Sequence, residues 1–274
     1  MSPISLGYSP CPNDTYIFYG LVRNKIQGAP IFEEVLEDIE TLNRLAMDDK
    51  LDMTKISFHA LAHLRDRYCL LHSGGALGRG CGPLVISSQP LADLTGKRIA
   101  IPGKLTTAAL LLRLFNPALD DLVVLPFHEI MDATQKGDVD AGVIIHESRF
   151  TYPDYGLHKV IDLGEWWEES TGHPIPLGGI LVRRDLGTET IQQIDRSLRN
   201  SIEYAHANPD AIKGYIHQHA QEMDEQVMQQ HIDLYVNDYT LDYLAGGEAA
   251  ITDLFDRAEK AGIVPPSNLP LFID

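Results

Sequence analysis

One stretch of the sequence joins a run of small and apolar residues to four side chains that can carry out proton and anion chemistry. The stretch is AGVIIHESRF, residues 141–150, in which the apolar run leads directly into His146, Glu147, Ser148 and Arg149. We expect a buried strand that ends at the ligand-facing edge of a sheet. An imidazole has an ordinary pKa near ~6.5, so His146 is the candidate general base at neutral pH. The alternative is a structural histidine.

The residues that follow His146 are weaker candidates. Successive residues of a strand point to opposite faces, so alternation predicts that Glu147 turns away from His146. We therefore interpret Glu147, Ser148 and Arg149 as strand-end residues and assign the proton transfer to His146 alone.

Two segments place hydrogen-bond donors at the start of a predicted helix. In PGKLTTAALLL, Thr106 and Thr107 open an apolar helix, and their hydroxyls, the backbone N–H groups and the helix dipole favour an anion. In KISF, Lys55 and Ser57 share one side of a strand that precedes a helix, which suits a carboxylate. Ordinary helix capping and a solvated lysine are the alternatives.

The segment SPCPND follows the first predicted strand and contains Ser9 and Asn13 as candidate ligand contacts. Its prolines stiffen a turn, and Asn13 or Asp14 caps the next helix, so turn and cap alone are the simpler interpretation. For Cys11 we favour that interpretation, because no base lies beside it in the sequence.

Other residues of catalytic type carry less weight. His59 and His63 have metal-ligand spacing on a helix, but the HExxH glutamate and a third ligand are missing, so we expect a helix face and no metal site. Trp166 and Trp167 either cover a lobe or wall the cleft, and both alternatives stay open.

Alternating strand and helix patterns must position these residues. Short apolar runs alternate with helix-period segments from the N-terminus to Asp185, which predicts βαβ units with mostly parallel sheets, and the chain then becomes almost wholly helical. The glycine-rich segment 73–85 lacks the Gly-Lys-Ser/Thr of a phosphate-binding P-loop, so we interpret it as a crossing between lobes, with a phosphate cradle as the alternative.

The strand–helix pattern restarts after this crossing, which predicts two lobes. Residues 1–86 and 186–274 would form a larger discontinuous lobe, and residues 87–185 a smaller inserted lobe. This is the plan of an α/β, two-lobed periplasmic-binding-protein type II fold with an interlobe cleft. Ligands of such folds lie at the carboxyl ends of strands, where the candidate residues are found.

Composition excludes several classes of partner. The formal net charge is −17, and such a field repels nucleic acid and anionic membrane surfaces, so we expect a small-molecule ligand. The three cysteines form no CxxC pair, and no signal peptide or membrane span is evident, so we expect a cytoplasmic protein, either a monomer or a weak homodimer.

Seven blocks of the sequence, in order from residue 6 to about residue 180, resemble the 1,4-dihydroxy-6-naphthoate synthase family of the futalosine pathway of menaquinone biosynthesis. The blocks are LGYSPCPNDTYIFYGL, LEDIETLNRLA, TKISFHAL, SGGALGRGCGPLV, PGKLTTA, AGVIIHESRFTY and DLGEWWEESTGHPIPLGGI. Several are long and differ from other families of the same fold, so the resemblance is specific.

The resemblance implies a cofactor-independent carbon–carbon lyase that binds no metal. Its substrate would be cyclic dehypoxanthine futalosine, and its products 1,4-dihydroxy-6-naphthoate and a fragment of the ribose. It implies that His146 is the base. It also implies that the substrate is held by Lys55, Ile56, Ser57, Thr106 and Thr107.

Rival functions share parts of this pattern. A non-catalytic carboxylate-binding protein would have the same fold, because fold alone does not determine function. A transcription regulator would need a DNA-binding helix-turn-helix before the first lobe, and the chain instead begins with a strand. A metal-dependent hydrolase would lose activity in the presence of a chelator.

Overall fold

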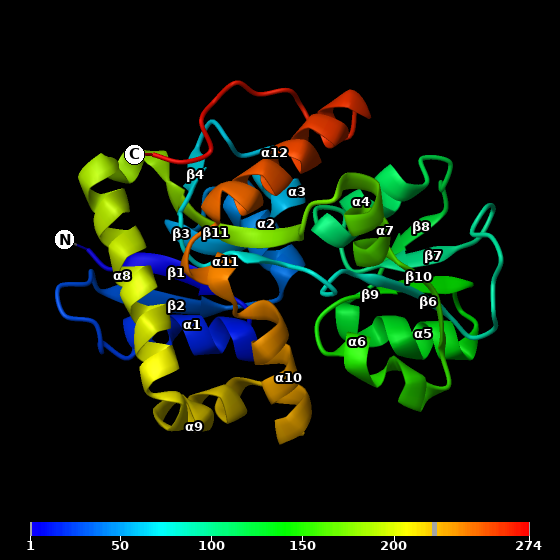
Figure 1. The fold of residues 1–274 in the computed structure, drawn as a ribbon, viewed down its shortest axis with the longest axis horizontal. Coiled ribbons are helices and arrows are strands. Elements are labelled where there is room, and N and C mark those ends of the chain that lie inside the picture. Colours follow the sequence, from blue (N-terminus) through cyan, green and yellow to red (C-terminus); the bar gives the residue numbers. More distant parts are fainter. Residues whose placement is uncertain (1, 221–223, 274) are drawn as a thin grey trace.

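The computed structural model describes residues 2–220 and 224–273, and within these ranges the chain forms two lobes side by side, each built on one mixed sheet (Figure 1). The sheet of the larger lobe has the order β2 (Phe32–Leu36), β1 (Ile4–Tyr8), β3 (Met53–Ser57), β11 (Ile175–Arg183) and β4 (Tyr68–Leu70), and β5 (Ala76–Gly78) also pairs with β11. The sheet of the smaller lobe has the order β10 (His158–Asp162), β6 (Leu84–Ser87), β9 (Ala141–Ile144), β7 (Ile99–Ile101) and β8 (Leu122–Val124).

Helices cover both sheets (Figure 1). Those of the larger lobe are α1 (Pro12–Val22), α2 (Ile39–Met47), α3 (Phe58–Leu61), α8 (Thr188–Ala207), α9 (Pro209–His219), α10 (Glu225–Tyr235), α11 (Asp238–Leu241) and α12 (Leu244–Lys260). Those of the smaller lobe are α4 (Thr107–Phe115), α5 (Ile130–Lys136), α6 (Ser148–Thr151) and α7 (Leu163–Thr171). Short 3-10 segments are Phe127–Glu129, Tyr152–Tyr155 and Arg184–Leu186.

The predicted α/β two-lobed fold is confirmed, but the prediction of mostly parallel sheets is wrong. Strands β1, β2 and β3 run parallel, as do β7, β8 and β9. Strand β11 is antiparallel to β3, β4 and β5, and β6 is antiparallel to β9 and β10. Strands β6 and β11 each follow a crossing between the lobes. Each therefore enters its sheet at the edge where the parallel strands end, and runs in the opposite direction to them.

The sheet pairings also show where the chain changes lobes. Strand β6 (Leu84–Ser87) already belongs to the second sheet, and β11 (Ile175–Arg183) belongs to the first sheet. The predicted lobe boundary at 86/87 falls within β6, and the one at 185/186 falls after the whole of β11.

Local sequence explains how the helices near the interlobe pocket begin and end. The Asp38 carboxylate accepts the N–H of Glu40 at 2.9 Å and that of Thr41 at 3.1 Å, which caps α2. Thr106 caps α4 by accepting the N–H of Ala109 at 3.2 Å. Helix α5 ends at Gly137, whose φ of 79° is the left-handed conformation that glycine adopts without strain.

The first chain crossing touches the start of α7 (Leu163–Thr171) at a pair of glycines. A Cβ on Gly82 would lie 2.4 Å from the Cα and N of Gly164, so side chains at either position would force the crossing and the helix apart. This close approach explains part of the glycine-rich segment 73–85, which is a crossing as expected.

Hydrogen bonds join the lobes around the crossings. The buried Glu40 carboxylate of α2 accepts the N–H groups of Lys104 and Leu105, both at 3.2 Å. Thr107 donates to the carbonyl of Leu177 at 2.5 Å. None of the helices among the described residues has the length and apolar character needed to cross a membrane.

Candidate active site

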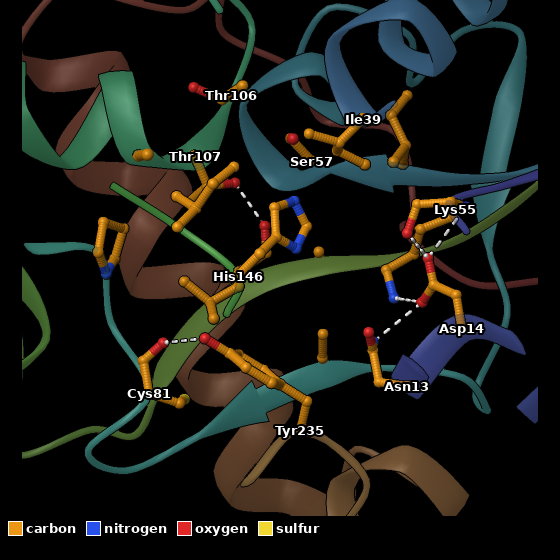
Figure 2. A pocket seen from close by; sticks show the side chains of 18 of the residues that line it. Asn13, Asp14, Ile39, Lys55, Ser57, Cys81, Thr106, Thr107, His146 and Tyr235 are labelled. Atoms are coloured by element: carbon orange, nitrogen blue, oxygen red, sulfur yellow. Dashed lines mark hydrogen bonds and ion pairs between the residues drawn. The ribbon is translucent and has the colours of Figure 1, made fainter. Parts of the chain in front are cut away.

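A pocket between the lobes brings all the predicted site residues together (Figure 2). Its walls include Ser9, Asn13, Lys55, Ile56, Ser57, Thr106, Thr107 and His146. They come from the last residues of β3 and from the segments after β1, β7 and β9. Carboxyl ends of parallel strands meet at one edge of a sheet, and here the edges of two sheets face each other. The roles assigned to these residues from the sequence stay predictions.

His146 lies just beyond strand β9, which ends at Ile144, and its backbone has a φ of 58°. This left-handed conformation is uncommon for a residue other than glycine, and it turns the chain at the pocket. The ring of His146 lies 5.1 Å from that of Phe127, between centroids, and its Nδ1 lies 3.4 Å from the Sγ of Cys11.

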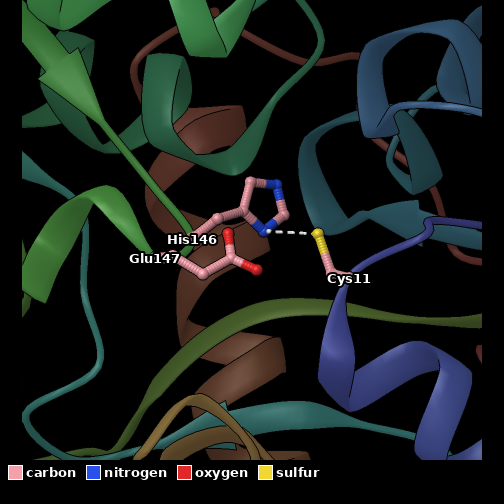
Figure 3. A group of neighbouring side chains, drawn as sticks. All are labelled: Cys11, His146 and Glu147. Atoms are coloured by element: carbon pink, nitrogen blue, oxygen red, sulfur yellow. Dashed lines mark hydrogen bonds between the residues drawn. The ribbon is translucent and has the colours of Figure 1, made fainter. Parts of the chain in front are cut away.

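The turn at His146 makes the expected direction of Glu147 wrong. Possible ligand atoms of Cys11, His146 and Glu147 all lie within 4.8 Å of one another (Figure 3). Strand alternation does not apply, because the strand ends two residues before His146. The interpretation of Cys11 as a turn residue alone also omitted its contact with His146.

Burial makes His146 a neutral base. Removal from water lowers the pKa of His146 to about 4, and the carboxylate of Asp14 opposes this shift only in part. At neutral pH the imidazole is therefore unprotonated and can accept a proton. The thiol of Cys11 is held in its neutral form, because burial and the neighbouring Glu147 raise its pKa well above the ordinary range.

A thiol, an imidazole and a carboxylate are also ligands that zinc and related metals accept. Among the described residues, Cys11, His146 and Glu147 are the group whose geometry could hold such an ion. The sequence did not indicate it, since these residues are separated along the chain and match no metal-binding motif.

A buried ion pair forms the floor of the pocket. Lys55 Nζ donates to Asp14 Oδ1 at 2.6 Å, and the two side chains are only 7% and 2% exposed. Asn13 donates to the same oxygen at 3.0 Å, and the Ser9 hydroxyl donates to Asp14 Oδ2 at 2.7 Å. The ammonium of Lys55 is therefore engaged by Asp14, rather than standing free for a substrate carboxylate.

The start of α4 supplies the positive end of the pocket. The first N–H groups of a helix have no hydrogen-bond partner within the helix. The Thr106 hydroxyl accepts a hydrogen bond from one of them, the N–H of Ala109. Thr107 and Ala108 line the pocket at this helix end. Opposite them, Ser57 does not cap a helix with its side chain; it exchanges two hydrogen bonds with Asn43, at 3.0 and 3.2 Å.

Helix α10 adds two pocket residues that the sequence analysis missed, His231 and Tyr235. His231 Nε2 lies 2.9 Å from Asn13 Oδ1, so it is the protonated nitrogen if the Asn13 amide donates to Asp14. The ring of His231 stacks on that of His146 with centroids 6.2 Å apart. The available signal in the sequence was the i, i+4 spacing of His231 and Tyr235 in HIDLY, because this spacing places both side chains on one helix face.

Two other residues considered from the sequence, His59 and Trp167, make contacts that hold the fold together. His59 is buried, with Nδ1 3.2 Å from the carbonyl of Thr106, so it joins the lobes rather than forming a helix surface. Trp167 is fully buried and donates to the carbonyl of Pro174 at 3.0 Å. Trp167 therefore belongs to the core and does not wall the cleft, which were the two alternatives left open by the sequence.

A second cavity adjoins the first at His146. Ser9, Ile39 and His146 line both cavities. The second cavity continues between the start of α2 and the segment 124–128, past Asp38 and Phe127. His146 therefore stands where the two cavities meet.

A two-lobed α/β fold with its ligand pocket at facing strand ends places the chain in the class of periplasmic-binding-protein-like folds. The periplasmic aliphatic sulphonate binding protein from Escherichia coli shares this fold with a TM-score of 0.65 at 12% identity, over 99% of this chain and 91% of that chain. At this identity the likeness concerns the fold alone.

The chain belongs to the menaquinone biosynthesis family, whose model matches residues 4–260. It is 50% identical to 1,4-dihydroxy-6-naphthoate synthase from Thermus thermophilus, over 100% of both chains. It is 46% identical to the enzyme of the same name from Streptomyces coelicolor, over 96% of this chain and 95% of the relative. The resemblance seen in the sequence is confirmed.

Proposed function

We propose that this protein converts cyclic dehypoxanthine futalosine to 1,4-dihydroxy-6-naphthoate by eliminative carbon–carbon cleavage, with His146 as the base. The observation that carries the proposal is the neutral imidazole of His146, held at a strand end where the two interlobe cavities meet. Full-length similarity to 1,4-dihydroxy-6-naphthoate synthases supports the choice of substrate.

In the proposed step, His146 removes a proton from the carbon skeleton of the substrate. The electrons released expel the ribose-derived fragment, which takes up a proton as it leaves. Formation of the aromatic naphthalene ring favours the products. The step transfers protons and moves electron pairs within the substrate, so the proposal includes no cofactor or redox partner.

The substrate carboxylate is proposed to bind at the start of α4, against Thr107 and Ala108. Lys55 is paired with Asp14, so among the described pocket residues the helix N-terminus is the positive group that is left for an anion. Lobe closure around the ligand would exclude water from the proton transfer.

Incubation of the purified protein with cyclic dehypoxanthine futalosine tests the proposal directly, with naphthoate formation followed by chromatography. We expect His146→Gln to lower kcat by about 100- to 10,000-fold, the usual contribution of a general base. His158→Gln is the matched control, because His158 is exposed on β10.

Near-normal turnover by a folded His146→Gln variant would show that the base is another group. Tight binding of the substrate without any turnover by the wild-type protein would instead favour the carboxylate-binding alternative.

A further inference from the structure

Atoms that can donate electron pairs to a cation converge from both lobes beside the pocket. Cys11 precedes α1 of the larger lobe, whereas His146 and Glu147 follow β9 of the smaller lobe. The sulfur of Cys11, a ring nitrogen of His146 and a carboxylate oxygen of Glu147 all lie within 4.8 Å of one another (Figure 3). Cys11 and Glu147 are buried. Lone pairs and a carboxylate that are withdrawn from water together favour a bound cation.

The spacing of these atoms fits a tetrahedral ion such as Zn²⁺. Zinc binds sulfur at about 2.3 Å and imidazole nitrogen at about 2.1 Å, which places the two ligand atoms about 3.6 Å apart. Cys11 Sγ and His146 Nδ1 are 3.4 Å apart. The Glu147 oxygen lies within 4.8 Å of both, so a side-chain movement of about 1 Å brings it to the distance of a third ligand.

A further buried lone pair faces the same carboxylate from α10. The Asp14 carboxylate can only accept, so the Asn13 amide presents its NH₂ group to Asp14 and its oxygen to His231. The amide oxygen also only accepts, so the proton of the neutral His231 ring is on Nε2. Nδ1 of His231 lies 3.8 Å from Glu147 Oε1 and has no hydrogen-bond partner among the described residues. A cation held by Glu147 would place positive charge beside this lone pair.

The chemistry of the three ligands selects among metal ions. A thiolate and an imidazole suit Zn²⁺ and Co²⁺, whereas Mg²⁺ and Ca²⁺ prefer oxygen ligands. Cys11 and His146 both line the second cavity, so an ion that enters this cavity meets both side chains. We therefore expect the protein to bind Zn²⁺ in the presence of an excess of Mg²⁺.

We propose that Cys11, His146 and Glu147 form a binding site for Zn²⁺, and that the bound ion inhibits the enzyme. The ion takes the lone pair of Nδ1, the nitrogen that faces Cys11, so the proton of the neutral His146 ring is on Nε2. The thiol releases its proton to solvent as the ion binds. His146 then has no lone pair with which to accept a proton from the substrate. The inhibition rests on the proposed function, whereas the binding site does not.

Cobalt spectroscopy tests the binding site without substrate. Co²⁺ occupies zinc sites of this kind, and its bond to a thiolate adds a near-ultraviolet absorption band that a site of nitrogen and oxygen ligands lacks. We expect one equivalent of Co²⁺ to produce this band in the untagged wild-type protein, and one equivalent of Zn²⁺ to remove it. The band reports a thiolate ligand, so Cys11→Ala should abolish it, whereas Glu147→Gln should retain it with weaker binding.

Isothermal titration measures the affinity of each variant for Zn²⁺. We expect Cys11→Ala to weaken binding by about 100-fold or more, because residues that only support a metal ligand already contribute about 10- to 100-fold. Cys69→Ala is the matched control and should bind as the wild type does. Cys69 is a buried thiol on β4 whose hydrogen-bond partner is the carbonyl of Val182.

Turnover of cyclic dehypoxanthine futalosine tests the inhibition. We expect saturating Zn²⁺ to lower the rate by about tenfold or more, because the contribution of the base is lost, and a chelator to restore it. Mg²⁺ at the same concentration should have no effect. Each variant is compared with and without Zn²⁺, so its own rate cancels. Cys11→Ala should lose sensitivity to Zn²⁺, and Cys69→Ala should keep it.

Three results would overturn the inference. One is the absence of a cobalt–thiolate band in the wild-type protein. Another is a Cys11→Ala variant that is folded, as judged by circular dichroism, and binds Zn²⁺ as tightly as the wild type. The third is turnover that a chelator abolishes and Zn²⁺ restores, which would make the ion a cofactor. Full turnover by a protein with the thiolate-bound ion in place would contradict the inhibition and the role of His146 as base, and would leave the binding site standing.

Discussion

At the scale of single residues, the pocket depends on polar side chains that are buried together. Asp14 receives hydrogen bonds from Lys55, Asn13 and Ser9, and all four residues line the pocket. Burial of such a pair contributes little net stability, but loss of one partner leaves an unpaired charge away from water. The cost of substitution is therefore large.

Substitution of Lys55 tests this cost. We expect Lys55→Met to lower the free energy of unfolding by about 3–5 kcal/mol, measured by urea denaturation, because the Asp14 carboxylate loses its counter-charge. Lys136→Met is the control, since its pair with Asp132 is exposed and contributes about 0–1 kcal/mol. Equal stability losses in the two variants would contradict the prediction.

At the scale of elements, the first crossing between the lobes packs directly against the start of α7. Gly82, which precedes β6, and Gly164, at the start of α7, leave no room for side chains between them. The crossings fix how the edge of one sheet faces the edge of the other. The contact between His146, in the smaller lobe, and Cys11, in the larger lobe, depends on this alignment.

A methyl group at Gly82 should disturb that alignment. We expect Gly82→Ala to destabilise the protein by about 1–3 kcal/mol or more, because its Cβ would overlap the backbone of Gly164. Gly214→Ala adds the same group in α9, where it would meet nothing within 4 Å, and should be neutral or stabilising by up to about 1 kcal/mol. Thermal and urea unfolding compare the two variants; a neutral Gly82→Ala result would refute the prediction.

At the scale of the whole molecule, buried histidines link stability to pH. Burial lowers the pKa values of His59 and His146 to about 4, and that of His231 well below its ordinary range. In the unfolded chain each pKa returns to about 6.5. Between these limits the unfolded chain binds protons that the folded protein does not, so stability decreases as pH falls from about 6.5 towards 4.

The expected slope is at most about 1.4 kcal/mol per pH unit for each of these histidines, measured by urea unfolding between about pH 6 and pH 5. His59→Asn keeps a donor to the Thr106 carbonyl but cannot titrate, so it should reduce the slope by one histidine's share. His158→Gln, at an exposed position, should leave the slope nearly unchanged. Stability that stays constant down to pH 5 would be inconsistent with three buried neutral histidines.

The sequence by itself determined the two-lobed α/β class, the helix start at Thr106, the family and the pocket positions of residues such as Lys55, Thr106 and His146, whereas the expected caps at Ser57 and at Asn13 or Asp14 are wrong. These features follow from periodicity, capping residues and strand ends, which neighbours along the chain encode. The rule that ligands bind at strand carboxyl ends then placed them at one cleft.

The tertiary structure alone decided how these residues are paired. Cys11 meets His146 across 135 positions, His231 meets Asn13 across 218, and Lys55 meets Asp14 across 41. The direction of Glu147 was decided by a left-handed turn that strand alternation could not predict. Such contacts depend on how separate elements pack against one another, and packing of distant segments leaves no pattern in the local sequence of either one.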